Sequence, residues 1–355
     1  MPNNSKQTQG KAKFTFEYPR IRGIVTTVGG HKVEFSDEAA QLGLTERESA
    51  RLSRAIGLES RYLVRNKFTT TSDLCVQSAE RLIDGLNIDP SSIGGLIFVS
   101  QSPDYAAPST AISMQNRLGL PISVMAFDMR LGCSGFIYGL SVAFSLVESG
   151  LERVLLCVGD VASRLVATND HSITPIMGDA GSAILIERDQ SRSFFQLYSD
   201  GSGERALYIP NSGLRLIPED AELPPLMRMD GAQVFNFTLQ RVPALIDSIL
   251  SMADVDSDAI DYFVLHQPNK YILNNIQKRL GIDDSKFPKG TQSHFGNQNS
   301  ASIPGTISGF LSEQFSHGRL KSVFAGFGIG LSWGACVLET DHIFAPEVFY
   351  EKEEE

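Results

Sequence analysis

Short, almost uninterrupted apolar runs alternate along the chain with longer stretches that mix apolar and polar residues. The short runs are typical of strands buried in a sheet, and the mixed stretches of helices packed on that sheet. We predict strands at residues 21–28, 93–100, 122–127, 153–158, 181–187, 194–198, 261–265 and 323–326. We predict helices at residues 45–56, 70–86, 108–118, 136–149 and 234–252, with a short one beginning near 36 and a break in the last at Pro243. This alternation indicates an α/β protein with a mainly parallel sheet.

The same pattern starts again after residue 190. The strand at 261–265 repeats the role of the strand at 93–100, and the strand at 323–326 resembles the one at 153–158. We therefore predict two similar halves, residues 21–190 and 191–345, the second of which carries a Gly/Pro-rich insertion at 200–229. The polar residues 1–20 and the acidic residues 346–355 are predicted to be flexible tails.

Composition excludes several classes of function. The chain has 355 residues and a net charge of −10, which argues against a nucleic-acid binder that neutralises phosphates. Its four cysteines form no CxxC pair and no zinc spacing, so we expect no metal and a reducing, cytoplasmic compartment. No run approaches the roughly 20 apolar residues that span a bilayer, and residues 1–20 lack the apolar core of a secretory signal, so we expect no membrane association.

Cys133 is the candidate nucleophile. It lies between the predicted strand at 122–127 and the predicted helix at 136–149, and Gly132 and Gly135 allow a sharp turn and a close approach by another molecule. The positive end of the helix dipole should favour the thiolate, which is the reactive form. The other three cysteines lie in apolar surroundings and are expected to be structural, as most buried cysteines are: Cys75, Cys157 and Cys336.

Two further polar residues occupy positions suited to chemistry. His266 directly follows the predicted strand at 261–265, at the carboxyl end where α/β sheets bind ligands. Asn297 lies in a stretch of small polar residues that also fits a helix-capping turn, and both interpretations can hold together.

Five segments, in the same order, resemble the β-ketoacyl-acyl carrier protein synthase III group of the thiolase-like superfamily. They are Asp-x-x-x-x-Cys-Ser-Gly-Phe-x-Tyr-Gly-Leu at 128–140, Met-Gly-Asp-Ala-Gly-Ser-Ala at 177–183, His-Gln-Pro-Asn at 266–269, Phe-Gly-Asn-Gln-Asn-Ser-Ala-Ser-Ile-Pro at 295–304 and Gly-Phe-Gly-Ile-Gly-Leu-Ser-Trp-Gly at 326–334. The resemblance implies a five-layered α-β-α-β-α fold built from two similar halves, a homodimer, and a Cys133–His266–Asn297 triad. It also implies acyl-thioester substrates on coenzyme A or acyl carrier protein, and no cofactor.

The implied reaction is a decarboxylative Claisen condensation. Cys133 takes an acyl group from a thioester, and a malonyl-type thioester then loses carbon dioxide and attacks the acyl-cysteine, giving a 3-oxoacyl product. His266 and Asn297 would stabilise the enolate oxygen, while backbone N–H groups near Cys133 and the loop of Gly328 and Gly330 would bind the oxyanion.

Three other functions remain alternatives. The first is a relative of the same family that passes the acyl group to an alcohol or amine. The second is a papain-like cysteine hydrolase, which shares the order Cys, His, Asn but has a Cys-Gly-Ser-Cys-Trp signature that this chain lacks. The third is a non-catalytic partner subunit, which the intact triad disfavours.

The chain departs from the family pattern around its substrates. Ile329 interrupts what are usually three successive glycines, and the primer-pocket phenylalanine that acetyl-selective members donate across the dimer falls on Ala107. An asparagine near the pantetheine channel falls on Ala232. The implied acyl group is therefore larger than acetyl.

Contacts to the acyl donor also differ. The tryptophan and arginine that grip the adenine of coenzyme A fall on Arg51 and Ala55, although the neighbouring Arg54 offers a replacement. An arginine implicated in carrier-protein docking falls on Tyr271. Three basic residues nearby are the remaining docking candidates: Lys270, Lys278 and Arg279.

Overall fold

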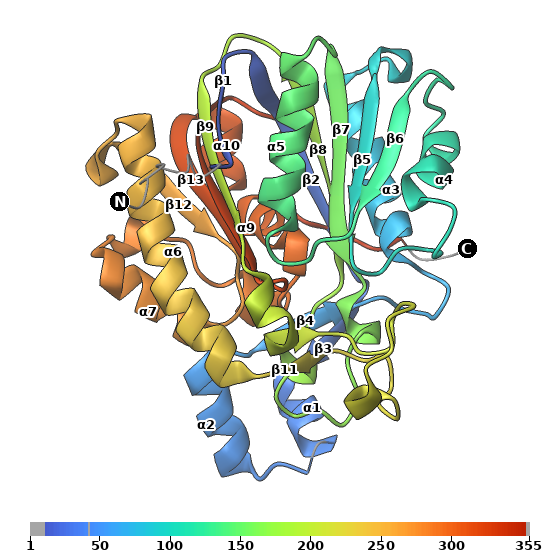
Figure 1. Ribbon diagram of the computed structural model, residues 1–355, viewed down its shortest axis with the longest axis vertical. Coiled ribbons are helices and arrows are strands. Elements are labelled where there is room, and N and C mark those ends of the chain that lie inside the picture. Colours follow the sequence, from blue (N-terminus) through green and yellow to red (C-terminus); the bar gives the residue numbers. More distant parts are fainter. Residues whose placement is uncertain (1–10, 42, 353–355) are drawn as a thin grey trace, which may run out of the picture.

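Two β-sheets with helices between them and on both outer sides make up the molecule (Figure 1). The computed structural model describes residues 11–41 and 43–352. Helices α3 (Thr71–Leu86) and α4 (Thr110–Arg117) cover the outer face of the first sheet. Helices α5 (Gly135–Glu148) and α9 (Ser302–Phe310) lie between the sheets, and α6 (Gly231–Ala253) and α7 (Lys270–Leu280) lie beyond the second sheet. These are the five layers that the family resemblance implies.

The first sheet has the strand order β15-β2-β8-β7-β5-β6. Its strands are β2 (Pro19–Val28), β5 (Gly95–Val99), β6 (Met125–Met129), β7 (Arg153–Asp160), β8 (Ala180–Arg188) and β15 (Phe349–Tyr350). The strands β7, β5 and β6 are parallel, whereas β8 runs antiparallel to both β7 and β2.

The second sheet repeats this arrangement with the order β1-β9-β14-β13-β12. Its strands are β1 (Lys13–Phe16), β9 (Ser193–Ser199), β12 (Tyr262–Leu265), β13 (Arg319–Gly328) and β14 (Ser332–Asp341). Here β12 runs parallel to β13, as β5 does to β7, and β14 runs antiparallel to β13 and β9. The predicted equivalences of 261–265 with 93–100 and of 323–326 with 153–158 are confirmed.

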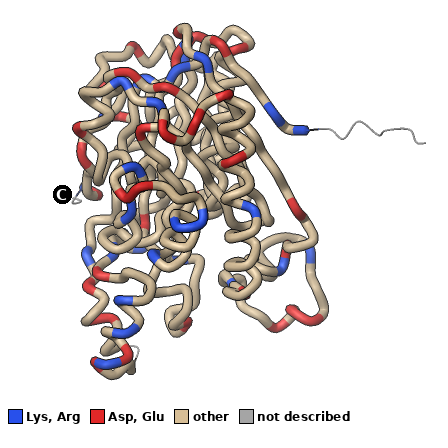
Figure 2. Tube along the Cα trace, turned by 90° about the vertical axis from the view of Figure 1, so that its left-hand side faces the viewer, with Lys and Arg blue, Asp and Glu red and all other residues tan. Residues whose placement is uncertain are grey.

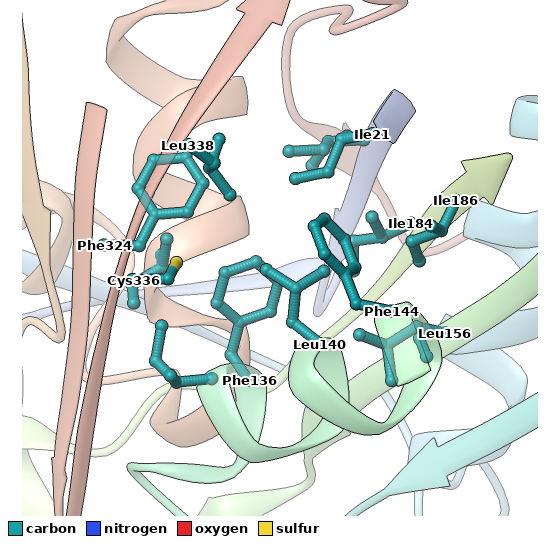
Figure 3. Close-up of a cluster of buried hydrophobic side chains, with 14 of the residues drawn as sticks. Ile21, Phe136, Leu140, Phe144, Leu156, Ile184, Ile186, Phe324, Cys336 and Leu338 are labelled. Carbon is teal, nitrogen blue, oxygen red and sulfur yellow. The ribbon is translucent and has the colours of Figure 1, made fainter. Parts of the chain in front are cut away.

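Helix α5 joins the two sheets through one apolar face. Phe136, Leu140 and Phe144 follow one another at four-residue intervals, so they lie on the same side of the helix. Figure 3 shows them pointing into a cluster formed from both sheets, with Ile184 on one side and Phe324 on the other. All are almost fully buried, and each contributes about 1.5–3 kcal/mol. This packing fixes the helix that follows Cys133.

Both predicted tails are partly wrong. β1 pairs antiparallel with β9, because Phe16 packs its ring edge-on against Phe144 and Phe195 in the core. β15 pairs parallel with β2, and the buried carboxylate of Glu351 accepts hydrogen bonds from main-chain N–H groups and a threonine hydroxyl. Of these predicted tails, residues 1–10 and 353–355 lie outside the described residues.

Two interior predictions also need correction. The strand predicted at 122–127 begins only at Met125, and Ile122 lies fully exposed in the preceding turn. The predicted break at Pro243 is absent, because α6 continues through this buried residue. The carbonyl of Leu239, which proline leaves without its helical N–H partner, accepts a hydrogen bond of 3.1 Å from Arg279 Nη1 instead.

The remaining elements form smaller units. An antiparallel pair of strands, β3 (His31–Glu34) and β4 (Ser60–Leu63), encloses α1 (Phe35–Gln41) and α2 (Glu46–Ile56) between them in the chain, and α2 has a capping box between Thr45 and Glu48. The insertion contains a two-stranded sheet of β10 (Leu207–Tyr208) and β11 (Arg228–Met229). The short helices α8 (Thr291–His294) and α10 (Ser312–His317) flank α9. No helix in the described part of the chain is long and apolar enough to cross a membrane.

Candidate active site

The three predicted catalytic side chains meet at one cavity of about 430 Å³. Cys133 lies between β6 and α5, His266 directly follows β12, and Asn297 precedes α9. Each therefore comes from a different segment, and two of them follow the carboxyl ends of parallel strands, where α/β sheets bind ligands.

Cys133 sits under the glycine-containing loop that follows β13. A Cβ atom on Gly328 would lie 2.9 Å from Cys133 Sγ, so only glycine lets the loop approach this closely. Burial raises the pKa of the Cys133 thiol to about 12, although hydrogen bonds from the Ile329 N–H and from its own N–H oppose the rise. The expectation that the helix start favours thiolate is therefore wrong for the resting site, because loss of hydration outweighs the helix dipole.

His266 is held as a neutral ring. Burial lowers the pKa of its imidazole to about 3. Its Nδ1 lies 3.1 Å from Ser302 Oγ, and its ring meets Phe327 edge-on at 5.4 Å. At neutral pH the imidazole therefore carries a single N–H.

Asn297 is fixed by the loop that surrounds it. Its Oδ1 accepts the N–H of Asn299 at 3.0 Å, so its NH₂ group is the part available to a ligand in the cavity. Its backbone pairs with the segment around Met177, through the Ile176 carbonyl and the Gly178 N–H. The segment at 177–183, which resembles the family without having an assigned role, thus positions the asparagine.

Two polar residues of the site were missed by the sequence analysis. Asn299 lines the cavity, and its Oδ1 accepts a hydrogen bond from Cys133 Sγ at 3.7 Å. Asp160, fully buried at the end of β7, accepts hydrogen bonds from the Gln101 N–H and the Ser100 hydroxyl, yet burial raises the pKa of its carboxyl to about 6. The rule that placed His266 at a strand end would have indicated Asp160 as well.

The predicted substrate-binding residues are scattered. Ala232, at the start of α6, lines the cavity. Ala107 lies on the exposed loop between β5 and α4, and it is absent from the described lining of the cavity. Arg54 lies exposed on α2, where its Nε donates to the Ala50 carbonyl. Only Ala232 is therefore brought to Cys133 within one chain.

The predicted docking residues lie on α7 beside the cavity. Lys270 packs against Gly57 at the end of α2, while Lys278 and Arg279 are exposed farther along the helix. Arg279 also bonds to α6, as described above. Tyr271 stacks on Phe235 with ring centroids 5.3 Å apart, lines the cavity and is 53% exposed, so the cavity reaches the surface beside α7.

Known proteins resemble this chain in both sequence and overall fold. The family model described as 3-oxoacyl-(acyl-carrier-protein) synthase III matches residues 127–201, and its C-terminal counterpart matches residues 250–340. The chain is 35% identical to a Campylobacter jejuni protein provisionally named 3-oxoacyl-(acyl-carrier-protein) synthase 3, over 96% of this chain and 99% of that protein. It is 31% identical to a Streptococcus equi β-ketoacyl-(acyl-carrier-protein) synthase III, over 86% of this chain and 94% of that protein. A 3-oxoacyl-(acyl-carrier protein) synthase from Burkholderia xenovorans superposes with a TM-score of 0.92 at 31% identity, covering 96% of this chain and 99% of that one.

Proposed function

The chain belongs to the 3-oxoacyl-(acyl-carrier-protein) synthase III family of condensing enzymes, and we propose that its reaction proceeds through an acyl group carried on Cys133. The observation that supports this most directly is the meeting of Cys133, His266 and Asn297 at one cavity. The proposed chemistry needs only these groups and two thioester substrates, so we propose no metal and no organic cofactor.

The first half-reaction transfers the acyl group. Cys133 Sγ attacks the thioester carbonyl carbon, and the N–H groups of Cys133 and Ile329, which face the sulfur, bind the oxygen as it becomes negative. The carbon–sulfur bond of the donor then breaks. The Cys133 thiol loses a proton in this step, and the departing sulfur of the donor gains a proton to become a free thiol.

The second half-reaction forms the carbon–carbon bond. A malonyl-type thioester loses carbon dioxide, and its carbonyl oxygen becomes an enolate that His266 and Asn297 stabilise with N–H groups. We propose that the Ser302 hydroxyl, 3.1 Å from Nδ1 of the neutral His266 ring, donates to this nitrogen, which assigns the imidazole proton to Nε2 for the enolate oxygen. The enolate carbon attacks the acyl-cysteine carbonyl, and Cys133 leaves.

The acyl donor is proposed to be an acyl carrier protein or coenzyme A bound beside α7. Helices α2 and α7 contact one another, and Arg54, Lys270 and Lys278 lie on them. On the side that Figure 2 turns to the viewer, acidic and basic residues are interspersed along the chain. The docking proposal therefore rests on these individual side chains and not on a broad basic face.

Separate measurement of the two half-reactions tests this function. An acyl thioester should add one acyl mass to the protein, and Cys133→Ala should abolish the adduct while Cys157→Ala, a matched control at another buried cysteine, keeps it. His266→Ala or Asn297→Ala should retain the adduct but slow malonyl decarboxylation by about two orders of magnitude, the typical effect of losing one oxyanion donor. An adduct that survives in Cys133→Ala would overturn the nucleophile, and normal turnover by Asn297→Ala would favour simple acyl transfer.

A further inference from the structure

A second cavity, of about 340 Å³, lies on the other side of the loop that follows β13. Three side chains line both cavities: Gln101, Leu207 and Ile329. Of the two glycines beside Ile329, Gly328 lines only the cavity at Cys133 and Gly330 lines only the second one. The loop is therefore a wall with one cavity on each face.

The side chain of Ile329 closes this wall next to the nucleophile. Its Cγ2 lies 2.9 Å from the position that a Cβ on Gly132 would occupy, and the Gln101 amide approaches the same point. Ile329 also packs against the cluster that contains Leu207 and Met227. Ile329, Gln101 and Leu207 thus form a partition over the residue that precedes Cys133.

We propose that this partition, chiefly the side chain of Ile329, sets the upper limit on the length of the acyl group that Cys133 can carry, and that the second cavity would accept the distal part of a longer acyl chain. The proposal rests on the proposed acylation of Cys133. It assigns to this chain a specificity determinant at the position where the family pattern has glycine.

The position of the acyl carbonyl explains why Ile329 matters. With the carbonyl oxygen on the Ile329 N–H, the first carbons of the chain begin beside the Ile329 side chain. Beyond the partition, Leu165, Ile209 and Pro225 offer apolar surface to a hydrocarbon chain. The lining of the second cavity also includes four polar side chains: Arg130, Glu204, Tyr208 and Ser212. Removing the side chain at 329 would connect the two spaces without moving the backbone donor.

The test is a chain-length series. Wild-type protein is incubated with acyl thioesters from two to sixteen carbons, and the adduct on Cys133 is quantified by intact mass. We expect Ile329→Gly and Ile329→Ala to raise the ratio of long-chain to short-chain acylation rates by roughly tenfold or more, because even one methylene that fits a pocket changes selectivity by that order. Ile329→Val, which keeps the β-branch, should show a ratio of long-chain to short-chain acylation rates close to that of the wild type.

Two additions separate the possible outcomes. Leu207→Ala opens the partition at a residue of the insertion, away from the loop next to Cys133 Sγ. It should also raise the ratio of long-chain to short-chain acylation rates. The second addition is equilibrium binding of free fatty acids of the same lengths to Cys133→Ala protein, with and without Ile329→Gly. It measures the chain length that the two cavities can hold without requiring acylation of Cys133. An unchanged length profile in Ile329→Gly, Ile329→Ala and Leu207→Ala overturns the partition. If the wild type forms no adduct but Ile329→Gly still changes the length of fatty acid that binds best, the proposed acylation of Cys133 is wrong and the proposed partition stands.

Discussion

Burial decides the protonation state of each functional side chain. Cys133 is 8% exposed and rests as a thiol, while the buried His266 is neutral. A neutral ring can donate a hydrogen bond to an enolate without acting as a competing base. The residue types and their places at element ends follow from the sequence. Their protonation does not, because it depends on how much water the folded chain excludes.

The effect of burial on the Asp160 carboxyl should be measurable in the pH dependence of the free energy of unfolding. Its carboxyl pKa rises from 3.8 to about 6 in the folded protein because of burial. Between these values the folded state keeps a proton that the unfolded state has lost, so this residue lowers the free energy of unfolding as the pH rises from about 4 to about 6. Asp160→Asn cannot ionise and should therefore gain stability relative to wild type, by up to about 3 kcal/mol, between pH 4 and pH 7.

Urea unfolding at both pH values measures the difference. Asp247→Asn, which removes the same charge from an exposed position on α6, is the matched control for the loss of a carboxylate. Parallel pH profiles for wild type and Asp160→Asn would contradict the assignment of a raised pKa to this carboxyl.

At the level of elements, α6 shows how a long helix tolerates a proline. Pro243 has no N–H to give to the Leu239 carbonyl, and the Arg279 guanidinium of α7 takes that place. We expect Arg279→Ala to lower the free energy of unfolding by about 1 kcal/mol. In a Pro243→Ala background, where the helix regains its own donor, the same substitution should cost much less.

A double-mutant cycle in urea measures this coupling. Lys278→Ala, the adjacent exposed residue of α7, serves as the control. Equal costs of Arg279→Ala in both backgrounds would show that the arginine does not compensate for the proline.

Local patterns predicted the interior elements better than the ends of the chain. The buried strands β5, β7 and β12 are recognisable in the sequence as apolar runs. Cys133 and His266 are recognisable as candidate catalytic residues from their positions next to predicted strands and helices. β1, β15 and the continuity of α6 depend on partners distant in sequence, such as Phe195 for Phe16 and Arg279 for Leu239. Segments as short as β1 and β15, and a proline within a helix, carry no local sign of such distant partners, so the sequence predicts tails or a break there.

At the scale of the whole molecule, the two halves exchange their ends. β1, from the start of the chain, joins the sheet of the second half, and β15, from its end, joins the sheet of the first half. The catalytic cavity also takes Cys133 from the first half and His266 and Asn297 from the second. The exchanged strands therefore tie together the two halves that both contribute to the site.

One edge of the first sheet remains open in the single chain. Among the described strands, β6 pairs only with β5, so one side of it presents free backbone groups. Three apolar side chains lie exposed on β6, the turn before it and the helix packed on it: Met125, Ile122 and Ile112. An unprotected apolar edge of this kind is a surface for pairing with another chain.

We therefore predict a homodimer that pairs through β6, which sedimentation at micromolar concentration would detect. Met125→Lys, which places a charge on the paired edge, should shift the protein toward monomer. Leu214→Lys, at a still more exposed apolar residue on the insertion, should leave the dimer intact. The exposed loop that carries Ala107 follows β5, the neighbour of β6, so pairing at this edge would bring that loop toward the partner and complete the acyl pocket there. Met125→Lys should then sediment with the mass of a monomer and should also be less selective among acyl groups than the wild type. A fully active, equally selective monomer would contradict both expectations.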